Sequence, residues 1–421
     1  MSSFLRATRL WRVLAQALGS ASMALACQAH AQPLTFERAL DAAQQHSALL
    51  QARRAAADGA RAAQASAAQL PDPRLTVGVD NLPVTTSDRF SLTRDSMTQL
   101  AIGWTQEVPN AAKRAARRDM AAARTERERA LLQSDESVVQ REASMAWLAS
   151  YYAQQRLTAF SALEAENQLL RDTVYARIAA ARAAPADAVL ARQDALALAD
   201  RRDELQRDAA RAAAALRRWV GPAADAPLAG EPPASATASL SAGALQHHPE
   251  LASYAPQADM ARAELREMEA AKTGDWSWGV SYGKRGPAYS DMVSLQLSME
   301  LPLWAAQRQD PQIAARRFEL QRIDAEREDM RRRVVGEVEA LQADDAQLTS
   351  QLDRLTRQSL PLDAERAALQ LASYQAGRAD LGSVLASRRD AIETRLRRIE
   401  LQGRQAQVRA QLAAHLAKEQ P

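Results

Sequence analysis

The feature that most constrains the fold is an internal repeat with a period of roughly two hundred residues. Residues 43–50 read AQQHSALL, and residues 245–252 read LQHHPELA. Each copy continues through two segments of strand-like alternation into a very long helical stretch, a short break and another helix. The segments before the long helices also match, QEVP at 106–109 and MELP at 299–302. The sequence therefore predicts one unit, helix, β-hairpin, long helix, turn, helix, present in two copies.

The repeat also suggests where the chain divides. We predict a signal peptide at residues 1–31, a first repeat at 32–220, a linker at 221–240 and a second repeat at 241–421. The linker is rich in Pro, Gly and Ala, which is typical of a connection rather than of a helix or strand. It is expected to join the two copies near the middle of the molecule.

Composition favours long helices packed side by side over one large globular core. Hydrophobic residues make up 47% of the chain, but many are alanine, and aromatic residues are only 5%. The 54 basic and 51 acidic residues nearly cancel, giving a net charge of +3, and they are interspersed. Interspersed charges indicate solvated helix faces. A nucleic-acid partner is excluded because the sequence has no clustered basic stripe.

The N-terminus has the pattern of an export signal. Arg6, Arg9 and Arg12 precede an apolar stretch, and the AHA segment at 29–31 predicts cleavage before Gln32. The only cysteine, Cys27, lies inside this segment, and acylation of Cys27 is the alternative. Cleavage would remove every thiol from the mature chain. No later stretch approaches the ~20 consecutive apolar residues of a membrane-spanning helix.

Four segments alternate between apolar and small or polar residues, as outer-membrane strands do. Two hairpins packed on a soluble protein are the alternative, but four strands leave open edges. Three copies would close a twelve-stranded barrel without edges, which predicts a homotrimer. The side chains expected to face lipid are Leu75, Val77, Leu100, Ile102, Trp104, Trp276, Trp278, Val280, Tyr282, Val293, Leu295 and Leu297.

The helical stretches have two characteristic lengths. Those expected at 111–182 and 311–375 would reach roughly 105 Å, and the shorter ones at 35–70, 187–219, 241–272 and 383–416 roughly 50 Å. Asp310 is expected to cap the second long helix with Pro311 in its first turn, and Pro361 to kink or break it. One long helix beside two stacked short ones, repeated around a threefold axis, gives a long α-helical barrel. The fold class is therefore mainly α with a small membrane β-barrel.

The sequence contains none of the patterns that carry catalysis. It has no nucleotide-binding loop, no nucleophile elbow and no metal-ligand spacing, so we expect no enzyme activity, no cofactor and no bound metal. His247 and His248 are adjacent and would point in different directions on a helix. Asp363, Glu365 and Asp380 are candidates for acidic residues lining a lumen, where carboxylates would attract cations. An ordinary solvated helix face is the alternative for each of them.

Several motifs together resemble one family. They are LTFERAL at 34–40, HPEL at 248–251, and YQAGRADL at 374–381 followed by Val384 and Leu385. In this order and spacing the chain resembles the TolC-like outer-membrane efflux channels over nearly all of its mature length. Residues 80–84 (DNLPV), 90–95 (FSLTRD) and 97–98 (MT) resemble the subgroup that serves heavy-metal efflux systems of the resistance-nodulation-division type. The second strand lacks that subgroup's extra methionines.

The resemblance implies a passive duct through the outer membrane of a Gram-negative cell, extending into the periplasm. It implies a homotrimer that works with a periplasmic adaptor and a proton-driven inner-membrane pump, exporting toxic solutes such as heavy-metal cations. Organic compounds, drugs or secreted proteins are alternative cargoes, and a periplasmic coiled-coil adaptor is the alternative function. The turns that would meet the adaptor and hold the closed tip contain Arg182, Pro185, Asp187, Gly377, Arg378, Asp380 and Leu381. Gly377 is expected to be left-handed there.

Overall fold

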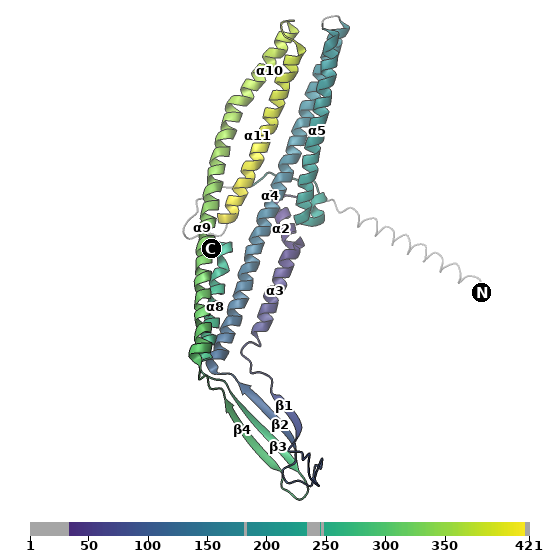
Figure 1. The fold of residues 1–421 in the computed structure, drawn as a ribbon. Helices are drawn as coiled ribbons and strands as arrows, with labels where there is room; N and C mark the ends of the chain where they lie inside the picture. Colours follow the sequence, from purple (N-terminus) through teal and green to yellow (C-terminus); the bar gives the residue numbers. More distant parts are fainter. Residues whose placement is uncertain (1–32, 181–182, 234–244, 246–247, 417–421) are drawn as a thin grey trace, which may run out of the picture. The chain divides into compact units, whose positions relative to one another are not determined.

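The structure is a computed structural model that describes residues 33–180, 183–233, 245 and 248–416 (Figure 1). The predicted signal peptide, Cys27, Gln32, Arg182, His247 and part of the linker lie outside these residues. The chain forms two compact units. The tip unit comprises the described residues of Met1–Ser47, Val138–Ala238 and Ala340–His415, and the sheet unit those of Ala48–Ser137, Ser239–Glu339 and Leu416–Pro421. Each unit combines matching pieces of both repeats.

The elements follow the predicted order in both copies. The first copy contains α2 (Phe36–His46), α3 (Ala48–Gln64), β1 (Arg74–Asp80), β2 (Gln99–Val108), α4 (Ala111–Ala179) and α5 (Pro185–Val220), followed by the 3₁₀ turn η1 (Gly221–Asp225). The second contains α7 (Pro249–Ala252), α8 (Tyr254–Ala270), β3 (Trp276–Arg285), β4 (Met292–Met299), α9 (Ala305–Arg354), the π-helical turn η2 (Leu355–Ser359), α10 (Leu360–Gln375) and α11 (Leu381–Leu416). Among the described residues, no helix is both long and apolar enough to cross a membrane.

The start of α9 corrects one prediction. The helix begins at Ala305, with the Trp304 carbonyl accepting from the N–H groups of Gln307 and Arg308, both at 3.1 Å, and Pro311 lies inside it. Asp310 does not cap the helix but pairs with Lys272, Nζ to Oδ1 at 2.5 Å. Near a helix N-terminus an internal proline removes only one backbone bond, so the helix can start earlier than the Asp-Pro pair suggests.

The predicted interruption at Pro361 is a π-helical turn, η2, and not a break. The N–H of Leu360 bonds to the Leu355 carbonyl, five residues back rather than four. The hydrogen-bond ladder therefore shifts just before Pro361, which has no N–H to donate. Helix α10 continues directly from this turn. The helix expected at 35–70 is interrupted instead, because Ser47 is extended, with ψ of 110°, between α2 and α3.

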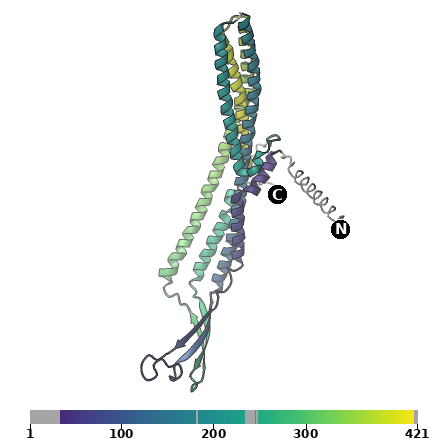
Figure 2. The same cartoon turned by 90° about the vertical axis from the view of Figure 1, so that its right-hand side faces the viewer.

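The four strands form one antiparallel sheet in the order β1-β2-β3-β4 (Figures 1 and 2). Directly paired residues lie on the same face of a sheet, so the register shows which side chains share a face. One face carries the row Leu75, Trp104, Val280, Leu295 and the row Val77, Ile102, Tyr282, Val293. The other carries the row Thr76, Gly103, Ser281, Ser294. All twelve side chains predicted to face lipid are exposed, up to 83% for Leu295.

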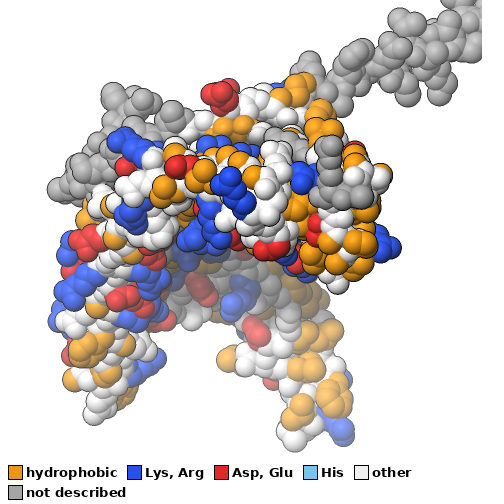
Figure 3. All heavy atoms as spheres, turned by 90° about the horizontal axis from the view of Figure 1, so that it is seen from above, with side chains coloured by type: hydrophobic (Ala, Val, Ile, Leu, Met, Phe, Trp, Pro, Cys, Tyr) orange, Lys and Arg blue, Asp and Glu red, His pale blue; other side chains and the backbone are white. Residues whose placement is uncertain are grey.

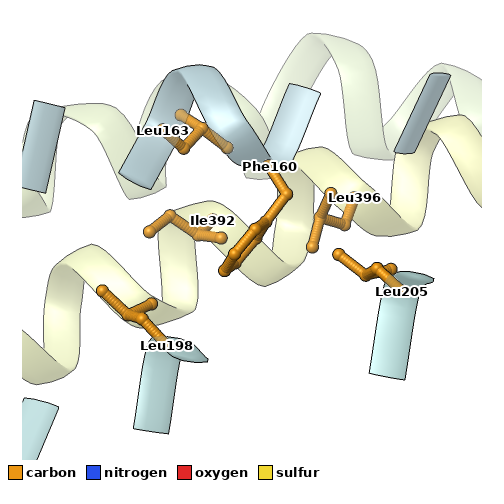
Figure 4. Packing of buried hydrophobic residues seen from close by; sticks show 6 residues of the cluster. All are labelled: Phe160, Leu163, Leu198, Leu205, Ile392 and Leu396. Atoms are coloured by element: carbon orange, nitrogen blue, oxygen red, sulfur yellow. The ribbon is translucent and has the colours of Figure 1, made fainter. Parts of the chain in front are cut away.

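The helices of the tip unit run alongside one another and share an apolar core (Figure 4). Phe160 and Leu163 come from α4, Leu198 and Leu205 from α5, and Ile392 and Leu396 from α11. Their spacings of three, four and seven residues place each pair on one side of its helix. Arg201 of α5 adds a bidentate ion pair with Glu393 of α11, at 2.9 and 2.8 Å.

The helices of the sheet unit are joined by ion pairs across their solvated sides. Arg53 of α3 binds Asp135 of α4 at 2.5 Å, Arg117 of α4 binds Glu267 of α8 at 2.7 Å, and Arg316 of α9 binds Glu264 of α8 at 2.6 Å. Basic and acidic side chains are likewise interspersed with apolar ones on the face shown in Figure 3. The arrangement agrees with the balanced, interspersed charges of the sequence.

The first described residues are bound tightly to the tip unit. Leu34 forms an isolated parallel bridge with Leu228, and its carbonyl accepts from the indole Nε1–H of Trp147 at 3.1 Å. The Trp147 ring is fully buried, with Phe36 packed edge-on and Tyr151 stacked on it. The segment at the start of the described residues is thus held by two distant parts of the sequence.

Candidate functional site: the helical tip

The two helix turns predicted as a functional tip come together in the tip unit. A hydrophobic cluster joins Val174 of α4, Tyr374 of α10, and Leu381, Val384 and Leu385 of α11. Leu381 is 0% exposed, so it anchors its turn instead of presenting an apolar surface. The cluster holds the end of α4 beside the α10–α11 turn.

Gly377 ends α10 in the left-handed conformation predicted from the sequence, with φ of 72°. The Gly377 N–H bonds to the Tyr374 carbonyl at 3.0 Å, and the Arg378 N–H bonds to the Ser373 carbonyl at 2.9 Å. This pair of bonds is the Schellman motif, which satisfies the last carbonyls of a helix and needs a left-handed residue after it. Gly377 therefore sets the direction in which the chain leaves α10. Arg378 is exposed beyond it.

Asp380 starts α11. Its Oδ1 accepts from the Ser383 N–H at 2.8 Å, and its Oδ2 accepts from the Ser383 hydroxyl at 2.8 Å. The bond from the Ser383 N–H lowers the pKa of Asp380 below its usual value. The carboxylate thus serves as the N-cap of α11, at the positive end of the helix dipole.

A polar link connects the two turns. The phenol of Tyr374, on α10, donates to Oδ2 of Asp187, in the first turn of α5, at 3.1 Å. The guanidinium of Arg177 lies 4.9 Å from the centroid of the Tyr374 ring. Burial, and then the bond to Asp187, raise the pKa of Tyr374, so the phenol keeps its proton at neutral pH. Tyr374 of one helical hairpin thus contacts both a cation, Arg177, and an anion, Asp187, of the other hairpin.

Helix α5 begins directly after the described part of the α4–α5 turn. Pro185 is the first residue of α5, where its missing N–H costs nothing, and the Asp187 N–H bonds to the Ala184 carbonyl at 3.0 Å. Arg182 lies outside the described residues. Pro185 and Asp187 thus start the returning helix within reach of Tyr374.

The acidic lumen candidates do not gather at one place. Asp363 is half-buried in the first turn of α10 and Glu365 is exposed two residues further along, whereas Asp380 lies beyond the other end of α10. The neighbouring Arg366 pairs with Asp390 of α11, Nη1 to Oδ2 at 3.1 Å. Within one chain, the three carboxylates therefore form no common cluster.

Sequence reasoning missed Tyr374 and Arg177 as residues of the tip. Tyr374 stood in the YQAGRADL motif, but the residues predicted to have a role there were Gly377, Arg378, Asp380 and Leu381. The signal was present, because Tyr374 is a lone aromatic residue three positions before the turn glycine in an Ala-rich helix. Arg177 gave no signal among the many arginines of α4, since its partner lies on a distant helix.

An open groove lies beside this link. It has a volume of about 320 Å³ and runs between Leu169, Val174 and Arg177 of α4 and Leu371, Tyr374 and Gln375 of α10, with Arg388 of α11 at its side. Its lining is mixed apolar and basic. Across the described residues, no group of three or more His, Cys, Asp or Glu side chains could hold a metal ion.

No family model and no curated protein sequence matches the chain. Solved structures do resemble it. The structure of CusC, studied for folding and transmembrane channel formation, matches with a TM-score of 0.79 and 16% identity over 90% of this chain and 91% of that one. A membrane protein from Pseudomonas aeruginosa matches with a TM-score of 0.77 and 16% identity over 90% of both chains. The outer membrane protein VceC from Vibrio cholerae matches with a TM-score of 0.74 and 16% identity over 90% of this chain and 95% of that one. These likenesses, at 16% identity, confirm the TolC-like fold of one chain, mainly helical with a small antiparallel sheet.

Proposed function

We propose that the chain is the outer-membrane channel of a tripartite efflux pump, located in the outer membrane of a Gram-negative cell and extending into the periplasm. The observation that carries the proposal is the apolar face of the sheet, whose twelve outward side chains are all exposed. A water-soluble protein would not leave so large an apolar surface uncovered. Lipid is the partner that such a face fits, in a fold that solved outer-membrane proteins share.

The same sheet favours a homotrimer. Strands β1 and β4 are its two edges, and each leaves a row of backbone groups unpaired. In hydrocarbon those groups need partners, and the β1 edge of one copy can pair with the β4 edge of the next. Three copies would close a barrel of twelve strands, with the Gly-, Ser- and Thr-rich face inside. The duct would be passive, and no enzymatic step is proposed.

The tip is the proposed docking site for a periplasmic adaptor, through which an inner-membrane proton-driven pump would deliver cargo. Two observations support this: the helix turns of both repeats meet there, and an open groove with apolar and basic lining lies beside them. Such a groove suits the amphipathic end of a partner helix. The link of Tyr374 to Asp187 would hold the tip closed until the adaptor engages.

Heavy-metal cations are the proposed cargo, on the resemblance of residues 80–98 to the subgroup described above; organic compounds remain the second candidate. Deleting the gene should then sensitise cells to metal salts more than to organic dyes. The opposite order of sensitivity would reject the metal assignment and leave the channel proposal intact. A periplasmic coiled-coil adaptor fits less well, because the chain has two helical hairpins and an exposed apolar sheet.

The sharpest test of the channel proposal contrasts two neighbouring positions on β4. Leu295 lies on the apolar face and Ser294 on the small, polar face. Arginine on a lipid-facing strand costs about 2–4 kcal/mol near the bilayer midplane. Leu295→Arg should therefore sharply reduce the trimer recovered from outer-membrane fractions, while Ser294→Arg should assemble. Equal recovery of the two variants would contradict the assignment of faces and the membrane location with it.

A further inference from the structure

The junction between β4 and α9 presents a compact apolar surface. Leu301, Leu303 and Trp304 are 65%, 71% and 64% exposed, and Met299 at the end of β4 is exposed beside them. Three large apolar side chains thus stand uncovered within four residues. We call residues 299–304 the junction segment.

The backbone of the junction segment is nevertheless held firmly. The Glu300 N–H bonds to the Asp275 carbonyl at 2.9 Å, and a Cβ on Gly274 would lie 1.8 Å from the Glu300 carbonyl oxygen, so the two backbones touch. The Trp304 carbonyl in turn accepts the first bonds of α9. The side chains are therefore exposed on a fixed support, not on a loose loop.

The equivalent place in the first repeat is built differently. There the QEVP segment is followed by Asn110, whose amide donates to the Ala270 carbonyl at 2.9 Å and the Thr273 carbonyl at 2.7 Å, and Pro109 is buried. The first junction is thus polar and satisfied within the chain. Leu303 and Trp304 take the place that Asn110 has in the first repeat, and both of their side chains are exposed.

The surroundings of the junction segment change from apolar to charged over a short distance. On the sheet side, Met299 pairs with Trp276 and Leu297 pairs with Trp278. On the helix side, Lys272 pairs with Asp310, and Lys113 with Asp275 at 2.8 Å. Glu300, also exposed, lies within the segment itself. Tryptophan beside charged groups, at the end of an apolar band, is typical of a membrane–water interface.

We propose that the junction segment lies at the phospholipid headgroup level of the leaflet nearer the helices, and that it fixes how deeply the sheet sits. Trp276 and Tyr282 are six residues apart on β3, about 20 Å along the strand, and the tilt of outer-membrane strands shortens their separation along the membrane normal, so both fit within the ~25 Å apolar band. The charged, exposed Glu300 side chain is more stable at the headgroup level than in the hydrocarbon. This inference rests on the proposed function, because it requires the sheet to be in a membrane.

Nitroxide labels on full-length protein in phospholipid vesicles test it. With Cys27→Ser as background, Leu303→Cys, Leu295→Cys on the sheet and Asp324→Cys on the exposed side of α9 each supply one labelling site. Collision rates with oxygen, enriched in hydrocarbon, and with a nickel chelate, confined to water, then report depth. We expect oxygen to dominate at Leu295, the two rates to be comparable at Leu303, and nickel to dominate at Asp324.

The possible outcomes separate the two proposals. A label at Leu303 that neither reagent reaches would place the segment against another copy of the chain and overturn the inference, while a lipid-exposed Leu295 would still support the channel. Nickel dominance at Leu295 would overturn both. Adding Trp304→Gln to the Leu295 variant should shift the depth of that label; an unchanged depth would show that the segment does not fix the position of the sheet.

Discussion

At the scale of single residues, Tyr374 is a side chain that joins helices of both repeats. Tyr374→Phe removes the hydroxyl that donates to Asp187 but keeps the ring beside Arg177. The loss should destabilise the tip by about 1 kcal/mol. Hydrogen exchange at the end of α10 should accelerate accordingly. Tyr175→Phe on the exposed side of α4 is the matched control and should leave exchange unchanged; equal effects would deny the link a role.

Asp380 gives the tip a dependence on pH whose sign follows from its lowered pKa. A carboxyl with a folded-state pKa below its unfolded value stabilises above the unfolded value of ~3.9 and loses that contribution as pH falls through the folded one. The first turn of α11 should therefore fray in acid, as faster hydrogen exchange there. Asp380→Asn should keep the cap and lose this dependence, whereas Asp380→Ala should fray at every pH. Identical acid responses of wild type and Asp380→Asn would exclude the carboxylate as the cause.

At the scale of elements, glycine matters by its backbone conformation. Gly377 is left-handed at the end of α10, whereas Gly336 lies inside α9 with open space where a Cβ would go. The same substitution should therefore act in opposite directions. Gly377→Ala should cost about 1 kcal/mol, and Gly336→Ala should stabilise by about 1 kcal/mol. Denaturation midpoints compare the two directly. A stabilising Gly377→Ala would mean that the Schellman turn is not maintained in solution.

Elements defined by strong local patterns were predictable from the sequence, and those decided by distant contacts were not. The strands followed from strict alternation, and the left-handed Gly377 from its place at the end of a helix. The start of α9 was missed because the Asp-Pro pair looks like a helix start, while Asp310 is drawn to Lys272. The bond between Tyr374 and Asp187 could not be foreseen, since its partners belong to different repeats.

At the scale of the whole molecule, the unpaired sheet edges predict how copies join. With Val77→Cys on β1, a second cysteine at Val293, Leu295 or Leu297 on β4 lies on the same face, and one of these pairs should form disulfides between neighbouring copies. Non-reducing gels should then show bands of up to three chains and none larger. A cysteine at Ser294 is the control, because it points to the opposite face and cannot be bridged. A ladder that stops at two chains would contradict the trimer.

The attachment of Leu34 has a consequence for the order of events during biogenesis. The segment that would emerge first from an N-terminus-first export machinery has its partners at Trp147 and Leu228, so it cannot settle until half of the chain has followed. The sheet can form only later, because β2 pairs with β3 of the other repeat. Non-local pairing of this kind is slow, and apolar surface stays exposed until the pairing is complete. A chain with this order of pairing is therefore expected to expose apolar surface until its second half arrives.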